Sequence, residues 1–549
     1  MTPLSGGHYN NASCCSVGDR SAVTASFGMT LRVGFFSILL FCALAFTLGA
    51  SDAIHNDPNL EDTVLRANQL FLNAHFDEGI ALIQQLEKSH PESPAVSFFT
   101  ANGYWWKIFR MYIYDKDAVD SDVDKTFDHY LDEAIDRAEK RLKNNKTDVQ
   151  ALFYLGNAYS VRSRVKGLRG SYFGAGRDAA KGKYYLEEVL KIDANQYDAY
   201  YNLGVYNYFA STLPGFAKVL KALLFLPGGS RSKGLSLLQL AGQKSSYFHD
   251  EAQLILARFY TEFEDQPYDA LRIVQSFHNK YPDNAWFRYW LATLYSDELN
   301  DYYQAGTIYE QILADCDNKV PGYTVELKNQ AWLKLARAYS RQLYPEKGIE
   351  EIQKLVATKP TRPVWIMPRA YLEMGNIYDQ IGMRNEATAA YRRVLTFSDY
   401  RDFHDQAQKL LDQDYNQTAA KIYRANLEGR RFAIAGDYAQ AQSAFDKVFQ
   451  QYPNNEQTMF AIAEMHFMKG SYGEATDMLN RVLDHHPKDP KWLLPGVYVR
   501  LGQVYEAQKQ AGAARVLYEK ALDTKFIASD DRNIAKRALK LMAQMKATE

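Results

Sequence analysis

The chain has 549 residues, of which 47% are hydrophobic and 23% charged, a composition typical of a folded protein with a sizeable core. Its 64 Lys and Arg residues balance 65 Asp and Glu residues, so the net charge is −1. This balance disfavours nucleic acid and anionic membrane surfaces as partners, because both select an excess of positive charge. Aromatic residues make up 14% of the chain. We expect them to pack between helices, with stacking on bases or sugars as the alternative.

The amino-terminal segment has the layout of a secretory signal. Residues 29–53 contain a positive Arg32, an apolar run that ends at Leu48, and small residues that suit cleavage after Ala50 or Ala53. We expect a cleaved signal peptide. An uncleaved signal anchor is the alternative, although the run is short for a membrane span of about 20 residues. The body of the protein is therefore expected to be exported, either periplasmic or anchored facing the periplasm, with any membrane association made through this segment.

Residues 1–28 are polar and rich in Gly, Ser and Asn, so we expect them to be unstructured and regard Met29 as a candidate for the true start. Only one of the four cysteines, Cys316, would remain after cleavage of the leader. The mature chain would then form no internal disulfide. Cys316 has no nearby histidine that would mark it as a nucleophile, so we expect a packed or loop thiol.

Residues 54–320 carry a loosely spaced repeat of large and small apolar residues with the period of paired helices. A first copy ends at Pro91, and the dipeptides Leu155-Gly156 and Leu203-Gly204 open two later copies. We expect residues 54–320 to form an N-terminal array of helix pairs that is interrupted by insertions.

Three insertions interrupt this array. Asp115–Asp124 is acidic but lacks the Gly and final Glu of a calcium loop, so we expect a solvated loop. Val161–Lys181 mixes Gly with Arg without the Walker pattern, so we expect a flexible basic loop that contacts an acidic partner or a neighbouring helix. Ala210–Gly229 is apolar, and we expect a short helix packed in the groove, with a partner- or membrane-contacting element as the alternative. The candidate contact residues in these insertions are Arg162, Arg164, Arg169 and Phe216.

Residues 321–528 repeat more regularly, and we expect them to form a C-terminal array of helix pairs. Small residues such as Ala336 and Gly348 stand where the two helices of a copy would cross closely. Pro453 and Pro487 end successive copies, 487 − 453 = 34 residues apart, because Pro cannot continue a helical hydrogen-bond ladder. The five copies run from Trp332 to Pro360, from Tyr371 to Val394, from Gly429 to Pro453, from Ile462 to Pro487 and from Tyr498 to Ala521.

Residues 529–549 contain one further amphipathic pattern, with Ser529 or Asp530 as the N-cap. We expect a capping helix here, because a stack of helix pairs must cover its last apolar face. The stripe that would face the stack contains Ile534, Ala538, Leu541 and Met545.

The sequence contains no motif of known catalytic or metal-binding chemistry. It lacks a zinc-binding HExxH, a CxxC, a GxSxG nucleophile turn and a dinucleotide fingerprint, and its 11 histidines are dispersed. We therefore expect no enzymatic activity, no catalytic residue, no metal and no cofactor.

On the residues quoted above, residues 58–525 resemble the tetratricopeptide-repeat family, in the form of an exported bacterial protein. The resemblance implies an all-α, right-handed superhelical solenoid of about eleven helix pairs with a C-terminal capping helix. It also implies a concave face, lined by the first helix of each pair, that binds peptides or helices of other proteins.

The carboxylate clamp with which some members hold chaperone tails is absent. Asn157 and Asn202 match two clamp positions, but Phe153 replaces the required Lys. Glu251 and Ile255 stand where a third repeat should supply Lys and Arg.

Helical phase then selects the groove-facing positions of the C-terminal array as candidates for partner binding. We expect a protein–protein interaction scaffold in an envelope assembly, with no nucleic acid as partner. The alternatives are an outer-membrane or pilus-biogenesis assembly factor and a carbohydrate- or lipid-binding protein. The candidate groove residues are Gln330, Arg337, Arg369, Asn376, Asp379, Tyr423, Asn426, Arg430 and Glu464.

Overall fold

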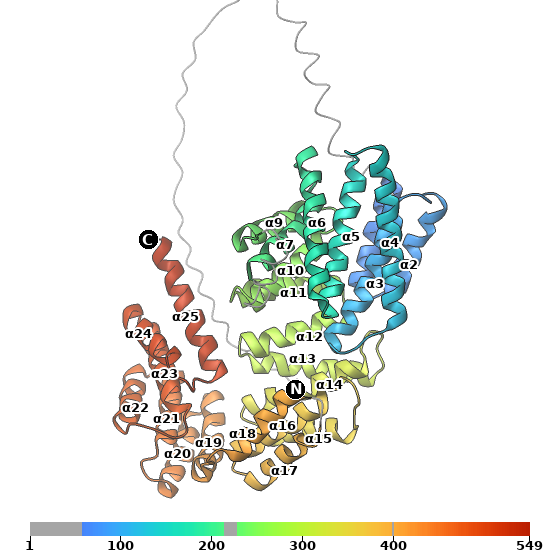
Figure 1. The fold of residues 1–549 in the computed structure, drawn as a ribbon. Coiled ribbons are helices and arrows are strands. Elements are labelled where there is room, and N and C mark those ends of the chain that lie inside the picture. The colour runs from blue at the N-terminus through green and yellow to red at the C-terminus, as the bar shows by residue number, and fades with distance from the viewer. Residues whose placement is uncertain (1–56, 213–227, 398–399, 549) are drawn as a thin grey trace, which may run out of the picture. The chain divides into compact units, whose positions relative to one another are not determined.

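A computed structural model of the protein describes residues 57–212, 228–397 and 400–548, which belong to one compact unit. The predicted leader, residues 29–53, lies outside the described residues, as do residues 1–28 and Phe216. Within the described ranges every regular element is a helix and none is a strand (Figure 1). This confirms the predicted all-α class.

In the N-terminal half the helices are α1 (Pro58–Leu72), α2 (Phe76–Gln84), the 3₁₀-helix η1 (Gln85–Lys88), α3 (Pro94–Tyr114), α4 (Ser121–Asn144), α5 (Val149–Leu168), α6 (Tyr172–Ile192), α7 (Tyr197–Thr212), α9 (Arg231–Lys244), α10 (His249–Glu262), α11 (Pro267–Lys280), α12 (Ala285–Thr293), the π-helical η2 (Leu294–Glu298) and α13 (Tyr302–Asp317).

In the C-terminal half the helices are α14 (Val325–Arg341), α15 (Pro345–Ala357), α16 (Ile366–Gln380), α17 (Arg384–Val394), α18 (Arg401–Asp412), α19 (Gln417–Ile434), α20 (Tyr438–Gln451), α21 (Glu456–Lys469), α22 (Tyr472–Asp484), α23 (Leu493–Ala507), α24 (Ala511–Leu522) and α25 (Ser529–Thr548).

The described helices form eleven pairs that follow one another along the chain, as the sequence predicts. The pairs are α1–α2, α3–α4, α5–α6, α7–α9, α10–α11, α12–α13, α14–α15, α16–α17, α19–α20, α21–α22 and α23–α24. The last helix, α25, packs on α23 and α24 and is the predicted cap. One helix was not predicted: α18 lies between the eighth and ninth pairs and packs against α16 and α17.

Local signals in the sequence start these helices. The carboxylate of Asp57 accepts hydrogen bonds from the amides of Asn59 and Leu60 and so caps α1. Pro94, like Pro267 and Pro345, occupies the first turn of its helix, where a missing N–H costs nothing.

Small residues at the helix crossings bring the two helices of a pair together. A β-carbon added at Gly348 of α15 would lie 2.6 Å from the carbonyl oxygen of Ala336 on α14. That distance is shorter than any relaxed contact, so the backbones of α14 and α15 can approach this closely only with Gly at the crossing. The predicted role of these two small residues is confirmed.

The N-terminal pairs enclose an aromatic core. Phe98, Phe99, Tyr154, Tyr247 and Phe248 are at most 3% exposed and come from α3, α5 and the segment before α10. The ring centroids of Phe98 and Phe99 are 5.0 Å apart and those of Phe99 and Tyr247 are 5.2 Å apart, in edge-to-face contact. These aromatic residues therefore serve packing, as expected.

Helix pairs that are far apart in the chain also contact one another. The Nδ2 group of Asn68 on α1 donates to the carbonyl of Tyr247 at 2.9 Å, and that of Asn284 donates to the carbonyl of Leu72 at 2.7 Å. The first pair is thereby joined to the segment before the fifth pair and to the start of the sixth. Stacked repeats ordinarily contact only their neighbours, so these bonds add a constraint that the repeat does not require.

Candidate functional site

A pocket of about 280 Å³ lies among α12, α14, α16 and α18. Three of the predicted groove residues line it: Gln330 and Arg337 from α14 and Arg369 from α16. The unpredicted α18 supplies Phe403 to its wall. The full lining is Tyr289, Gln330, Leu333, Lys334, Arg337, Trp365, Arg369, Glu373 and Phe403.

Helical spacing brings these side chains to one face. Gln330, Lys334 and Arg337 are separated by four and then three residues on α14, so they lie on the same side of that helix. Arg369 and Glu373 are separated by four residues on α16 in the same way. Helical phase thus placed these residues on the sides of α14 and α16 that line the pocket, but it did not predict the aromatic wall that α18 adds.

Arg337 is the pocket's unpaired cation. Lys334 forms an ion pair with Asp297, and the guanidinium of Arg369 lies 3.7 Å from the carboxylate of Glu373. Burial raises the pKa of Asp297, but the charges of Lys334 and, more weakly, of Arg337 outweigh it and hold that pKa below its ordinary value. Among the described residues, half-buried Arg337 makes no direct ion pair or side-chain hydrogen bond. A positive charge in an aromatic-walled pocket can therefore accept an anionic group.

Gln330 has a structural role that the sequence did not predict. Its Nε2 donates to the carbonyl of Tyr114 at 2.8 Å, and its Oε1 accepts from the hydroxyl of Tyr289 at 3.2 Å. The side chain is 6% exposed. Gln330 therefore ties α14 to the end of α3.

Asn426, Arg430 and Glu464 are also engaged within the protein. The buried Nδ2 of Asn426 donates to Thr458 at 2.9 Å. Glu464 lies between two guanidinium groups, 2.6 Å from Arg430 and 2.6 Å from Arg500. Burial raises the pKa of Glu464, but these two arginines lower it below its ordinary value. This network joins α19, α21 and α23, and the sequence pattern did not point to Arg500.

The remaining predicted groove residues lie outside the pocket. Asp379 accepts from Arg384 at 2.6 Å and from the hydroxyl of Tyr391 at 3.0 Å. Asn376 is exposed, and its Oδ1 accepts from Tyr391 at 3.1 Å. The hydroxyl of Tyr423 accepts from Gln380 at 2.6 Å.

The basic insertion, residues 161–181, is not the flexible loop that was predicted. α5 continues to Leu168 and α6 begins at Tyr172. Its arginines contact neighbouring helices, which was one of the two alternatives: Arg162 pairs with Asp178 at 2.9 Å, and Arg169 pairs with Asp124 at 2.8 Å. Arg164 donates to the hydroxyl of Tyr201 at 3.1 Å and also to Asn202. The prediction failed because glycines among charges suggested a loop, whereas carboxylates on neighbouring helices, Asp178 on α6 and Asp124 on α4, hold these arginines.

Most of the acidic insertion is exposed, as expected, but some of its aspartates are engaged within the protein. Asp115 is 3% exposed and accepts from Arg362 at 2.7 Å. The carboxylate of Asp117 accepts from the hydroxyl of Tyr400 at 2.7 Å, and Asp120 caps α4. These aspartates link the second pair to the segments that flank the eighth pair.

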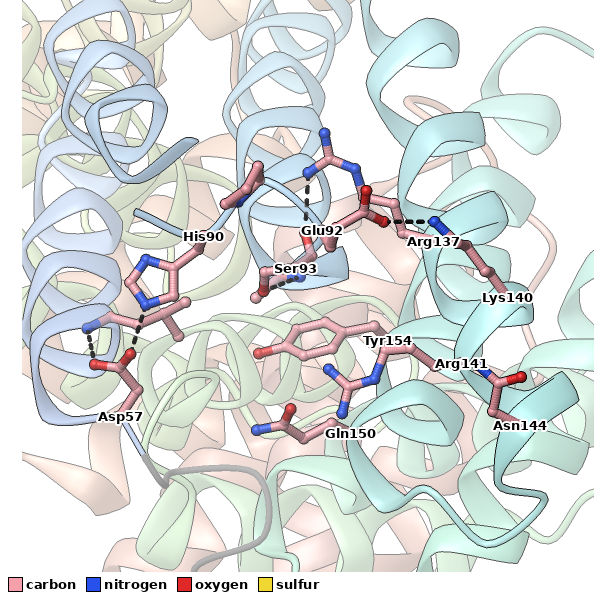
Figure 2. Close-up of a pocket in the computed structure, with 13 residues that line it drawn as sticks. Asp57, His90, Glu92, Ser93, Arg137, Lys140, Arg141, Asn144, Gln150 and Tyr154 are labelled. Carbon is pink, nitrogen blue, oxygen red and sulfur yellow. Dashed lines mark hydrogen bonds and ion pairs between the residues drawn. The ribbon is translucent and has the colours of Figure 1, made fainter. Parts of the chain in front are cut away.

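A second pocket, of about 410 Å³, lies among the starts of α1, α3 and α5 and the end of α4 (Figure 2). Its basic side chains face carboxylates: Lys140 lies 2.9 Å from Glu92, and His90 lies 2.5 Å from Asp57. Arg137 and Arg141 are likewise ion-paired. Because these positive charges are already neutralised, the pocket has less to offer an anionic ligand than the one at Arg337.

Within residues 57–212, 228–397 and 400–548, no group of His, Cys, Asp and Glu side chains is arranged to hold a metal ion. In the same ranges no helix is both long enough and apolar enough to cross a membrane. Cys316 is half-buried and packed, as expected, and burial raises the pKa of its thiol to about 11.

The fold and the groove define an all-α helical-repeat solenoid. A family model described as tetratricopeptide repeat matches residues 432–494, and a second model of the same description matches residues 368–399 and 495–526. These segments of the chain carry tetratricopeptide repeats, within a fold that typically serves as a non-enzymatic scaffold. The matched segments contain the predicted copies that begin at Tyr371, Ile462 and Tyr498.

Several solved structures are similar to this chain. A tetratricopeptide-repeat protein from Parabacteroides merdae is 15% identical, covers 54% of this chain and 98% of its own, and has a TM-score of 0.22. A human IFIT1 dimer with PPP-AAAA is 12% identical over 79% of this chain and 95% of that chain, with a TM-score of 0.31. The yeast Sti1 TPR2AB domain in complex with pHSP90 is 15% identical over 55% of this chain and 99% of that chain, with a TM-score of 0.19. No curated protein matches.

Proposed function

We propose that this protein is an exported scaffold that holds segments of other proteins in the groove of its C-terminal helix pairs, within an envelope assembly. The eleven helix pairs and the tetratricopeptide-repeat matches support an interaction scaffold. The signal-like residues 29–53 support export.

The observation that carries the proposal is Arg337. Half-buried Arg337 has no direct partner in the protein, so a ligand can replace the water at its guanidinium, and a hydrogen bond to a charged group contributes about 1.5–3 kcal/mol. Trp365 and Phe403 stand beside it in the pocket wall. The site therefore suits a peptide segment that carries a carboxylate next to an apolar side chain.

Site-specific crosslinking in intact cells tests this proposal. A photo-reactive phenylalanine analogue placed at Phe403 is expected to form adducts with a protein, recovered from the periplasmic or membrane fraction. The same analogue at Tyr268, which is 65% exposed on α11, serves as the control and is expected to form few adducts.

Arg337→Ala should reduce the adducts at position 403 at least fivefold, since about 1.4 kcal/mol corresponds to a tenfold change in affinity. The circular dichroism spectrum should stay unchanged, because Arg337 has no ion pair to lose. Adducts that consist only of lipid or saccharide, or protein adducts that persist in Arg337→Ala, would contradict the proposal.

A further inference from the structure

The last helix does more than cover the final pair. α25 packs on α23 and α24, but its polar side chains bond to the fifth and sixth pairs. Asn533 donates to the carbonyl of Asp297 at 2.9 Å, Arg537 donates to the carbonyl of Glu298, and Lys540 donates to the carbonyl of Glu264. Figure 1 shows the start of α25 beside α13. α25 thus reaches from the end of the array back to its middle.

The first turn of α25 places two adjacent carboxylates next to the groove's cations. Asp530 accepts from the hydroxyl of Tyr302 at 2.8 Å and lies 3.5 Å from the guanidinium of Arg341. Arg341 is on α14, four residues beyond Arg337, so it continues the same groove face. Asp531 lies near enough to Arg500 and Arg341 for their charges to lower its pKa, against the effect of burial.

The carboxylate of Asp531 lacks a direct partner of opposite charge among the described residues. Two carboxylates, those of Glu464 and Asp530, lie close enough to oppose its charge. Burial raises the pKa of Asp531 to about 6, and these like charges add to that effect.

The far end of α25 is more exposed than its first turns. In the predicted stripe, Ala538 is 7% exposed but Leu541 and Met545 are 55% and 67% exposed. The expectation that all four stripe residues face the stack is therefore wrong for the last two, because the array ends before them. The fully buried apolar residues of α25 are the small Ala535 and Ala538, while Ile534, Leu539 and Met542 are only partly buried, so its polar bonds add to a modest apolar contact.

We propose that the first turn of α25 is an internal ligand of the groove, and that the partner segment which binds there carries two adjacent carboxylates and displaces it. This inference rests on the proposed function and names the chemistry of its partner. While α25 occupies the groove, the partner cannot bind there. The apparent affinity for the partner is therefore the intrinsic affinity multiplied by the fraction of molecules in which the groove is open.

A labelled synthetic peptide of residues 527–545 is the probe for this exchange. Its affinity is measured by fluorescence anisotropy for the full chain and for the full-chain variant Asn533→Ala/Arg537→Ala, which weakens the chain's own α25 without altering the groove. The variant is expected to bind the peptide at least tenfold more tightly than the wild type. Equal affinity for the two proteins, or no binding to either, would overturn the inference.

Two controls make the result specific. A peptide with Asp530→Asn and Asp531→Asn should bind the variant at least tenfold more weakly, whereas a shift of less than twofold would count against carboxylate recognition. The chain variant Asp523→Asn changes an exposed carboxylate just before α25 and should bind the peptide as the wild type does. If crosslinking at position 403 captures a protein while peptide exchange fails, the scaffold stands and only the internal-ligand inference falls.

Discussion

At the scale of single residues, the groove is built from charges whose partners come from remote parts of the chain. Arg337 alone among the predicted groove residues combines a place in the pocket with an unpaired charge. Arg430 and Glu464 satisfy each other, so substitutions there would test stability before binding. Burial and pairing, which a helical pattern does not reveal, separate these roles.

Buried Glu251 should make the stability of the protein depend on pH. Its side chain is 6% exposed, and burial raises its pKa to about 8, with Asp250 and Asp198 acting in the same direction and Arg164 against it. Because the folded state holds this proton more tightly than the unfolded chain, stability should fall as the pH rises from about 4.5 to about 8.

Glu251→Gln should remove that dependence, with a difference from wild type of about 1.4 kcal/mol for each unit by which the pH exceeds the unfolded pKa. Urea unfolding at pH 5 and pH 8 measures it. Glu262→Gln, an exposed position on the same helix, should leave the pH profile as it is. A parallel pH profile for Glu251→Gln and wild type would show that the carboxyl is ionised in the folded protein.

At the scale of elements, small residues at the crossings decide how closely two helices pack. Helical period and residue size are local properties, so the copies from Trp332 onward predicted the pairs α14–α15 through α23–α24 correctly. The helix α18 was missed because residues 401–412 stand outside the repeat and have no partner helix to complete a pair.

Gly348→Ala should destabilise the protein although Ala favours helix by about 1 kcal/mol. The added methyl group would meet the carbonyl oxygen of Ala336 at 2.6 Å, and such overpacking costs about 1–3 kcal/mol. We expect a lower midpoint in urea. Gly512→Ala is the matched control, because a β-carbon there meets no atom within 4 Å, and it should raise the midpoint instead. A gain in stability at both positions would refute the tight crossing.

At the scale of the whole molecule, contacts between distant pairs join segments that a simple stack would leave independent. Asn68 bonds to Tyr247, 179 residues away, and Arg362 bonds to Asp115, 247 residues away. Such bonds make the unfolding of one pair depend on another, beyond the coupling between neighbours.

Asn284→Ala should loosen both the sixth pair and the first. Asn284 caps α12 and also donates to the carbonyl of Leu72, so amide exchange should rise in α1 as well as in α12, with a loss of about 1–3 kcal/mol. Asn455→Ala is the matched control. Asn455 caps α21, but its side chain bonds only to nearby Tyr452 and Thr458. Its effect should stay within the C-terminal pairs, and the idea fails if exchange in α1 rises equally in both variants.

The sequence by itself determined the repeat, the number of helix pairs, the small residues at their crossings and the sides of α14 and α16 that line the pocket. These follow from a period of a few residues and from side-chain size, which act within a pair. Only the tertiary structure decided that the N-terminal pairs close around an aromatic core, that α18 completes the pocket and that α25 returns to the middle of the array. Those outcomes depend on groups separated by up to 276 residues, such as the Lys540 side chain and the Glu264 carbonyl, and no local period records which of them will meet.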